Sequence, residues 1–151
     1  MSEERDAFAA KVAEKLYARD TTAQRLGISL DAVTMGAAIL SMTVTEDMLN
    51  GHGVAHGGYI FTLADTAFAY ACNGENVVTL AQHCQITFIS PGQQGERLKA
   101  TASELSKTGR SGLYDVEVHG DDGRLVAAFR GASRTVGGAT EQGLGVVPAD
   151  V

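Results

Sequence analysis

The sequence predicts an α+β protein in which an antiparallel sheet wraps around one central, buried helix. Two observations point to this fold class. Residues 59–74 are apolar on nearly every side, which is typical of a helix inside a core. Before and after this segment, apolar and polar residues alternate with a period of two, which is typical of strands. The connections between the later strands are too short for the crossover helices that a parallel sheet needs.

The N-terminal part is predicted to contain a helix followed by two strands. Residues 4–19 carry apolar side chains on one face, and residues 21–27 continue as a short helical link. The alternation then begins and extends over residues 28–45, where Gly36 marks a turn between two strand segments. Residues 46–58 are polar and rich in glycine, so we expect a loop that leads into the central helix.

Four further strands are predicted after the central helix. They are expected over residues 77–90, 95–107, 111–120 and 124–136. Turn signals separate them at Pro91-Gly92, at Gly109-Arg110 and at Asp121-Asp122-Gly123. Because these connections are short, we expect the four strands to form an antiparallel meander. A sheet of this kind around one apolar helix is the hotdog arrangement.

Length, composition and charge exclude several other classes of protein. The 151 residues are enough for one domain, which we expect over residues 1–138, with a flexible glycine-rich tail over 139–151. The net charge of −6 disfavours a nucleic-acid binder, and no apolar run is long enough to span a membrane. The N-terminus lacks the apolar centre of a signal peptide. Cys72 and Cys84 lie in apolar segments without CxxC spacing, so we expect reduced thiols and a cytoplasmic protein.

Asp65 is the first candidate for a functional residue. It is the only charged residue between Met48 and Gly74, inside a helix that is otherwise suited to burial. Burial of an unpaired carboxylate is costly, so such a group is hydrogen-bonded or lines a cavity. It is therefore either a general base or nucleophile, or a structural residue that meets a partner backbone at a dimer seam.

The sequence His56-Gly57-Gly58 comes just before the predicted helix and is the second candidate. Free N–H groups at the positive end of a helix dipole can polarise a carbonyl group, and glycines let a ligand approach the backbone. The alternative is a flexible loop before the helix, in which His56 only caps the helix N-terminus. Asp65 follows Gly57 by eight residues, which is about 12 Å along a helix. A single site would then combine the helix start of one subunit with Asp65 of another, which predicts an obligate dimer.

The run LNGHGVAHGGYIFTLADTAFAYACN resembles the hotdog-fold thioesterases of the phenylacetate-degradation type, the PaaI group. Their helix motif HGGxxFxLAD is matched from His56 to Asp65, and the strand motif FRGxS is matched near the C-terminus. The resemblance covers most of residues 7–138. It implies hydrolysis of acyl-coenzyme A thioesters, with phenylacetyl and hydroxyphenylacetyl groups as typical acyl groups. Coenzyme A is then part of the substrate, and no separate cofactor and no metal are expected.

The resemblance also assigns roles to individual residues. Asp65 is implied to be the catalytic carboxylate that activates water or attacks the thioester, and the Gly57 N–H is implied to polarise the carbonyl group. Asn50 and His56 are implied to orient substrate or water, with loop capping as their alternative role. The resemblance further implies a homodimer that pairs into a dimer of dimers. Substrate contacts are expected from Gly58, Phe61, Thr66, Gln82, Lys107 and Arg110, the last two through the coenzyme A phosphates.

Two other functions compete with this interpretation. A 3-hydroxyacyl thioester dehydratase on the same fold pairs a carboxylate with a histidine, and no histidine falls inside the central helix. A sensor that binds acyl-coenzyme A without hydrolysis has no use for a buried carboxylate such as Asp65. The four histidines show no metal-ligand spacing, and no GxSxG motif indicates a serine hydrolase.

Overall fold

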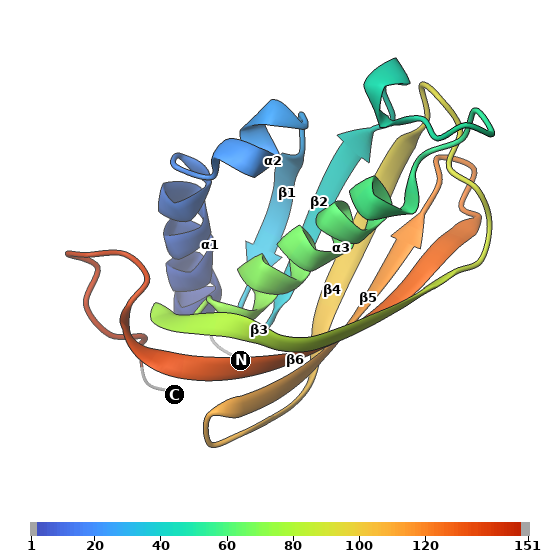
Figure 1. Ribbon diagram of the computed structural model, residues 1–151. Coiled ribbons are helices and arrows are strands. Elements are labelled where there is room, and N and C mark those ends of the chain that lie inside the picture. Colours follow the sequence, from blue (N-terminus) through green and yellow to red (C-terminus); the bar gives the residue numbers. More distant parts are fainter. Residues whose placement is uncertain (1–2, 149–151) are drawn as a thin grey trace.

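The computed structural model describes residues 3–148 and shows a curved sheet that holds one long helix in its hollow (Figure 1). This confirms the predicted α+β hotdog fold. The helices are α1 (Glu3–Tyr17), α2 (Thr21–Arg25) and α3 (Gly57–Cys72), with a short 3-10 helix, η1 (Glu46–Met48), before α3. The strands are β1 (Ser29–Thr34), β2 (Ala37–Thr43), β3 (Val77–Phe88), β4 (Arg97–Thr108), β5 (Ser111–His119) and β6 (Leu125–Ala139).

The six strands form one antiparallel sheet in the order β1-β2-β4-β5-β6-β3. Strands β4, β5 and β6 form the predicted meander, but the predicted hairpin between β3 and β4 is wrong. Strand β3 pairs with β6 instead, and residues 89–96 cross the end of the sheet. The ends of this connection are fixed far apart, because Ile89 N–H donates to the Val126 carbonyl and Gly95 N–H donates to the Val44 carbonyl. Strand β3 therefore lies at an edge of the sheet.

Helix α3 is held in the hollow by its apolar face. Leu63, Ala64 and Ala67 are fully buried, and the Phe68 ring packs against the rings of Tyr114 and Phe129 at centroid distances of 5.5 and 5.9 Å. The helix comes close to β6 because Gly131 has no side chain. A Cβ atom at this position would lie 2.8–2.9 Å from three atoms of the Phe68 ring. The absence of a side chain at Gly131 thus leaves room for the Phe68 ring between helix and sheet.

The C-terminal end of α3 is tied to β3 and to the last described residues. The Asn73 side chain accepts the Thr79 N–H at 3.0 Å and donates to the Thr79 carbonyl at 3.0 Å. The Asn76 side chain donates to the Glu141 carbonyl at 3.0 Å and accepts the Glu141 N–H at 2.7 Å. The flexibility expected for residues 139–151 stays a prediction, and residues 149–151 lie outside the described residues.

Candidate functional site

The N-terminus of α3 is formed by a histidine cap followed by two glycines. His56 is extended, and its Nδ1 accepts the Gly58 N–H at 2.9 Å, so His56 caps the helix as one alternative proposed. The helix begins at Gly57, two residues before the predicted start, because the cap compensates for the low helix propensity of glycine. Among residues 3–148, the Gly57 N–H has no hydrogen-bond partner. A free donor therefore stands at the positive end of the helix dipole.

A recess of about 460 Å³, here named the α3 pocket, opens beside this donor. The Phe88 ring of β3 stands directly over Gly57, where a Cβ atom would lie 2.8 Å from the ring carbon Cζ. Gly57 is thus required for the close approach of backbone and ring. The walls of the pocket include Val54, Ala55, Ile60, Phe88, Ile89 and Pro91, with polar atoms from Asn50 and Ser90.

The loop before α3 is closed by its own hydrogen bonds. The Asn50 side-chain oxygen accepts the His52 N–H at 2.9 Å, and the Asn50 N–H donates to the Val54 carbonyl at 2.8 Å. Ala55 N–H donates to the Gly92 carbonyl at 2.8 Å, which fastens the loop to the connection between β3 and β4. Asn50 therefore shapes the loop through its side-chain oxygen while it also lines the α3 pocket.

Asp65 lies in the middle of α3, half-buried on the side of the helix that faces β3. Its Oδ1 is 4.0 Å from the Sγ of Cys84, whose side chain points inward from β3. Burial raises the pKa of the Asp65 carboxyl, and no basic side chain within residues 3–148 lies at ion-pair distance from it. Such a carboxyl binds protons more tightly than an exposed one, which suits a general base.

Cys84 is a neighbour of the candidate site that sequence reasoning missed. Burial, and to a smaller extent the charge of Asp65, raises the pKa of the Cys84 thiol. The thiol therefore stays protonated beside the carboxylate and is a poor nucleophile. The alternation of β3 could have indicated that Cys84 faces the helix, because Cys84 and Ile86 share a strand face and both pack against the core.

Of the residues expected to contact substrate, three already make contacts within the chain, and a fourth lies on the edge strand of the sheet. The Thr66 hydroxyl donates to the Thr62 carbonyl at 2.6 Å, and the Phe61 ring packs edge-on against Phe129 at 5.4 Å. The Gly58 N–H is bound to the His56 cap. Gln82 is exposed on the edge strand β3.

The two expected phosphate ligands lie at the other end of α3 from Gly57. Lys107 pairs with Glu75 at 2.7 Å, just beyond the C-terminus of the helix, and Arg110 is exposed at the turn between β4 and β5. Since α3 has 16 residues, about 24 Å separates its two ends. One chain therefore does not bring Gly57, Asp65 and Lys107 together.

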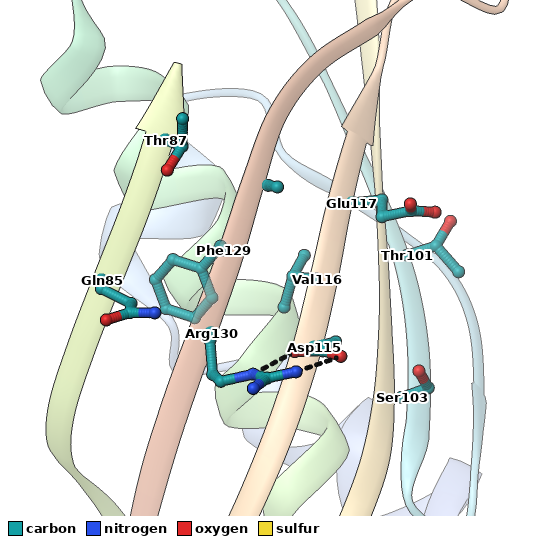
Figure 2. A pocket seen from close by; sticks show the side chains of 10 residues that line it. Gln85, Thr87, Thr101, Ser103, Asp115, Val116, Glu117, Phe129 and Arg130 are labelled. Carbon is teal, nitrogen blue, oxygen red and sulfur yellow. Dashed lines mark hydrogen bonds and ion pairs between the residues drawn. The ribbon is translucent and has the colours of Figure 1, made fainter. Parts of the chain in front are cut away.

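The outer face of the sheet carries a separate, shallow recess of about 530 Å³, with α3 behind the sheet (Figure 2). Its main charged feature is Arg130, which binds Asp115 through two hydrogen bonds of 2.7 and 3.0 Å. Arg130 follows the inward-facing Phe129 on β6 and so points away from the helix. This face is therefore separated from the residues on α3 by the sheet itself.

Two kinds of feature are missing from the part of the chain that the structure describes. No three His, Cys, Asp or Glu side chains there come together as a metal site. None of the helices in that part is both long and apolar enough to cross a membrane.

Comparison with known proteins identifies the family of this chain. The sequence model of the thioesterase superfamily matches residues 52–127, a span that includes the His56 cap, Gly57 and Asp65. The chain belongs to the thioesterase superfamily.

Individual relatives cover most of the chain. The acyl-coenzyme A thioesterase PaaI of Escherichia coli (strain K12) is 44% identical over 126 residues, which are 83% of this chain and 90% of that protein. A solved structure of the E. coli PaaI protein from the phenylacetic acid degradation operon matches with a TM-score of 0.88 at 42% identity, over 89% of this chain and 97% of that chain. A variant of PaaI from Thermus thermophilus matches with a TM-score of 0.75 at 35% identity, over 78% and 100% of the two chains.

Proposed function

We propose that the protein is an acyl-coenzyme A thioesterase that hydrolyses aryl-acetyl thioesters, such as phenylacetyl- and hydroxyphenylacetyl-coenzyme A. The observation that carries this proposal is the desolvated carboxyl group of Asp65 on the central helix of a thioesterase fold. The free N–H of Gly57 supplies the second group that the reaction requires. The similarity to PaaI supports the acyl-coenzyme A substrate class.

The chemical step needs a nucleophile and a donor for the carbonyl oxygen. The Gly57 N–H stabilises the developing negative charge of that oxygen. Asp65 either removes a proton from the attacking water or attacks the carbonyl carbon itself and forms a mixed anhydride that water then cleaves. In both routes the carbon–sulfur bond breaks and coenzyme A leaves as a thiolate. The thiolate takes up the proton that Asp65 removed from water or, in the anhydride route, a proton from solvent. The raised pKa of Asp65 makes the carboxylate both a stronger base and a stronger nucleophile, so it is compatible with either route.

The aryl-acetyl preference is supported by the α3 pocket. Its volume of about 460 Å³ and its mostly apolar walls suit a flat, apolar group. The Phe88 ring lies beside the Gly57 N–H, so an aryl group in this pocket would meet an aromatic face next to the carbonyl-binding donor.

We further propose a cytoplasmic homodimer that pairs into a dimer of dimers, with each active site shared by two subunits. Gly57 and Asp65 are about 12 Å apart along one helix, which is too far for a single thioester group to touch both. Strand β3 is a free edge within residues 3–148, and Leu80 and Phe88 on it are 56% and 51% exposed. Pairing of this edge with a second copy covers both side chains and supplies the missing half of the site.

The test is release of free thiol from a panel of coenzyme A esters with phenylacetyl, hydroxyphenylacetyl, benzoyl, short and long aliphatic groups. We expect fast turnover of the aryl-acetyl esters and a loss of about 10³-fold in Asp65→Asn, which is typical of removal of a general base. Asp115→Asn, on the outer face of the sheet, is the matched control and should retain activity. Binding without thiol release would favour a sensor, and an enoyl product would favour a dehydratase. Mass spectrometry of enzyme quenched during turnover distinguishes the two routes, because only nucleophilic attack leaves an acyl group on Asp65.

A further inference from the structure

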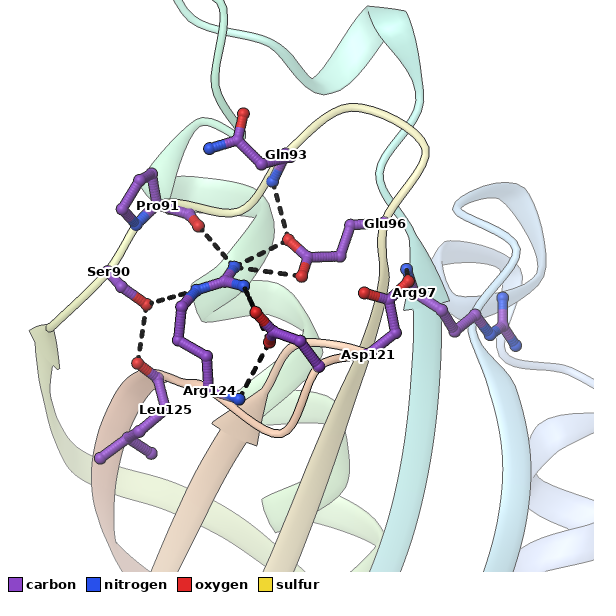
Figure 3. A network of polar contacts seen from close by, with 9 residues as sticks. Ser90, Pro91, Gln93, Glu96, Arg97, Asp121, Arg124 and Leu125 are labelled. Atoms are coloured by element: carbon purple, nitrogen blue, oxygen red, sulfur yellow. Dashed lines mark hydrogen bonds and ion pairs between the residues drawn. The ribbon is translucent and has the colours of Figure 1, made fainter.

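Arg124, just before β6, binds the connection between β3 and β4 at several points (Figure 3). Its Nε donates to the Ser90 hydroxyl at 3.0 Å, and its Nη2 donates to the Pro91 carbonyl at 2.8 Å. The same Nη2 reaches both carboxylate oxygens of Glu96, at 2.9 and 3.1 Å. Its Nη1 donates to both oxygens of Asp122 at 2.9 Å. One guanidinium group therefore fixes both the beginning and the end of this connection.

The acceptor Glu96 is closely enclosed. Its side chain is 6% exposed, and its Oε1 also accepts the Gln93 N–H at 2.9 Å. A Cβ atom at Gly120 would collide with this carboxylate, so the absence of a side chain at Gly120 lets the carboxylate lie against the neighbouring turn. The hydrogen bonds from Arg124 outweigh the burial of this carboxyl and lower its pKa, so the carboxylate stays charged opposite the guanidinium group. These contacts therefore hold the connection between β3 and β4 in one place.

Two contacts link this connection to the start of α3. Ser90 and Pro91, both held by Arg124, form one wall of the α3 pocket, and Gly57 lies on the same pocket. The next residue, Gly92, is buried and accepts the Ala55 N–H at 2.8 Å. Ala55 directly precedes the His56 cap, so the connection holds the chain at the point where the helix begins.

We propose that Arg124 is a positioning residue for thioester hydrolysis, which sets the wall of the α3 pocket and the place of the Gly57 amide donor. This inference rests on the proposed function of that site. A donor stabilises the developing oxyanion only within hydrogen-bond distance, and a displacement of about 1 Å from a remote change can cost about a hundredfold in rate. Arg124 touches no reacting atom and acts through Pro91, Gly92 and Ala55.

The test compares Arg124→Gln with the matched control Arg130→Gln. Arg130 also binds a carboxylate through two hydrogen bonds, but it does so on the outer face of the sheet. For phenylacetyl-coenzyme A we expect kcat to fall about tenfold to a hundredfold in Arg124→Gln, with a smaller change in KM. We also expect the ratio of kcat/KM between aryl-acetyl and short aliphatic esters to change, whereas Arg130→Gln keeps both quantities within about twofold. A purely structural role does not move this ratio, because the fraction of folded protein cancels in it.

Two further variants and a second measurement keep the test decisive. Arg124→Lys retains the charge without the forked geometry and should lie between wild type and Arg124→Gln. Glu96→Gln retains an acceptor and should give a smaller effect in the same direction if Arg124→Gln fails to fold. Hydrogen–deuterium exchange of residues 49–60 should become faster in Arg124→Gln but not in Arg130→Gln.

The outcomes separate this inference from the proposed function. The positioning role would be overturned if Arg124→Gln kept the wild-type kcat, the wild-type ratio of kcat/KM between the two kinds of ester and the wild-type exchange rate of residues 49–60. Equal losses of activity in Arg124→Gln and Arg130→Gln would overturn it as well. If the wild-type protein releases no thiol from any ester, the proposed function fails. The exchange comparison then still decides whether Arg124 holds the start of α3.

Discussion

The substitution Gly57→Ala tests the close contact between the start of α3 and the Phe88 ring. A Cβ atom at residue 57 would lie 2.8 Å from Cζ of the ring and 3.2 and 3.3 Å from its two Cε atoms. Favourable contacts between carbon atoms are about 3.5–4.0 Å, so the ring has to move by about 1 Å. Phe88 is 51% exposed, and its ring has room to swing aside. The added methyl group leaves the Gly57 N–H in place and changes only the space around it.

The expected effect on stability is small, because two contributions oppose each other. Replacement of glycine by alanine in a helix is favourable by up to about 1 kcal/mol. Displacement of the Phe88 ring from its rotamer costs about 0.5–1.5 kcal/mol. The free energy of unfolding should therefore change by less than about 1 kcal/mol, which shifts Tm by about 2–4 °C at most for a chain of this size.

The expected effect on activity is larger, because the displaced ring turns beside the pocket that should hold the acyl group. We expect kcat/KM for phenylacetyl-coenzyme A to fall about tenfold or more. Phe88→Leu shortens the side chain, and the double variant should recover part of the loss, which a double-mutant cycle measures as coupling. Full activity of Gly57→Ala, or strictly additive effects in the double variant, would refute the contact as a determinant of the site.

Three further expectations follow from other parts of the fold. The folded protein holds a proton on Asp65 more tightly than the unfolded chain, so wild-type stability falls as pH rises from the ordinary Asp pKa through the raised one. Asp65→Asn should therefore raise Tm at pH 7. Thermal unfolding at several pH values should show that this gain disappears in acid. Gly131→Ala forces a methyl group against the buried Phe68 ring and should cost about 1–3 kcal/mol in chemical denaturation, partly relieved by Phe68→Leu. Leu80→Lys places a charge on the exposed edge of β3 and should give monomers in light scattering together with loss of thioesterase activity, whereas active dimers would contradict pairing through this edge.

Much of the fold could be predicted because local patterns determine it. The segment at residues 59–74 is apolar on nearly every side, and burial in a curved sheet satisfies it. The same apolarity isolates Asp65 as a single charge, so this candidate could be found without any structure. The structure adds the half-burial of this carboxyl and the direction of its pKa shift.

The pairing of β3 could not be predicted because alternation does not specify which strand is the neighbour. The turn signal at Pro91-Gly92 is real, but it lies within a connection that crosses the end of the sheet rather than within a hairpin. What holds this connection is the contact of Arg124 with Glu96, two residues whose pairing depends on the final topology. Contacts of this kind appear only once the strands have been placed.

The contacts of α3 place both candidate groups beside the free edge of the sheet. Gly57 lies against Phe88 and Asp65 lies against Cys84, so both candidate groups face the same strand, β3. Four residues of a strand span about 13 Å, and the eight helix residues from Gly57 to Asp65 span about 12 Å, so helix and strand run side by side in opposite directions over this length. The side of α3 that carries Asp65 borders the last strand of the sheet, beyond which residues 3–148 provide no further cover. In the proposed dimer, a second copy paired antiparallel along β3 would reverse the order of these two contacts and would bring its own helix start toward Asp65.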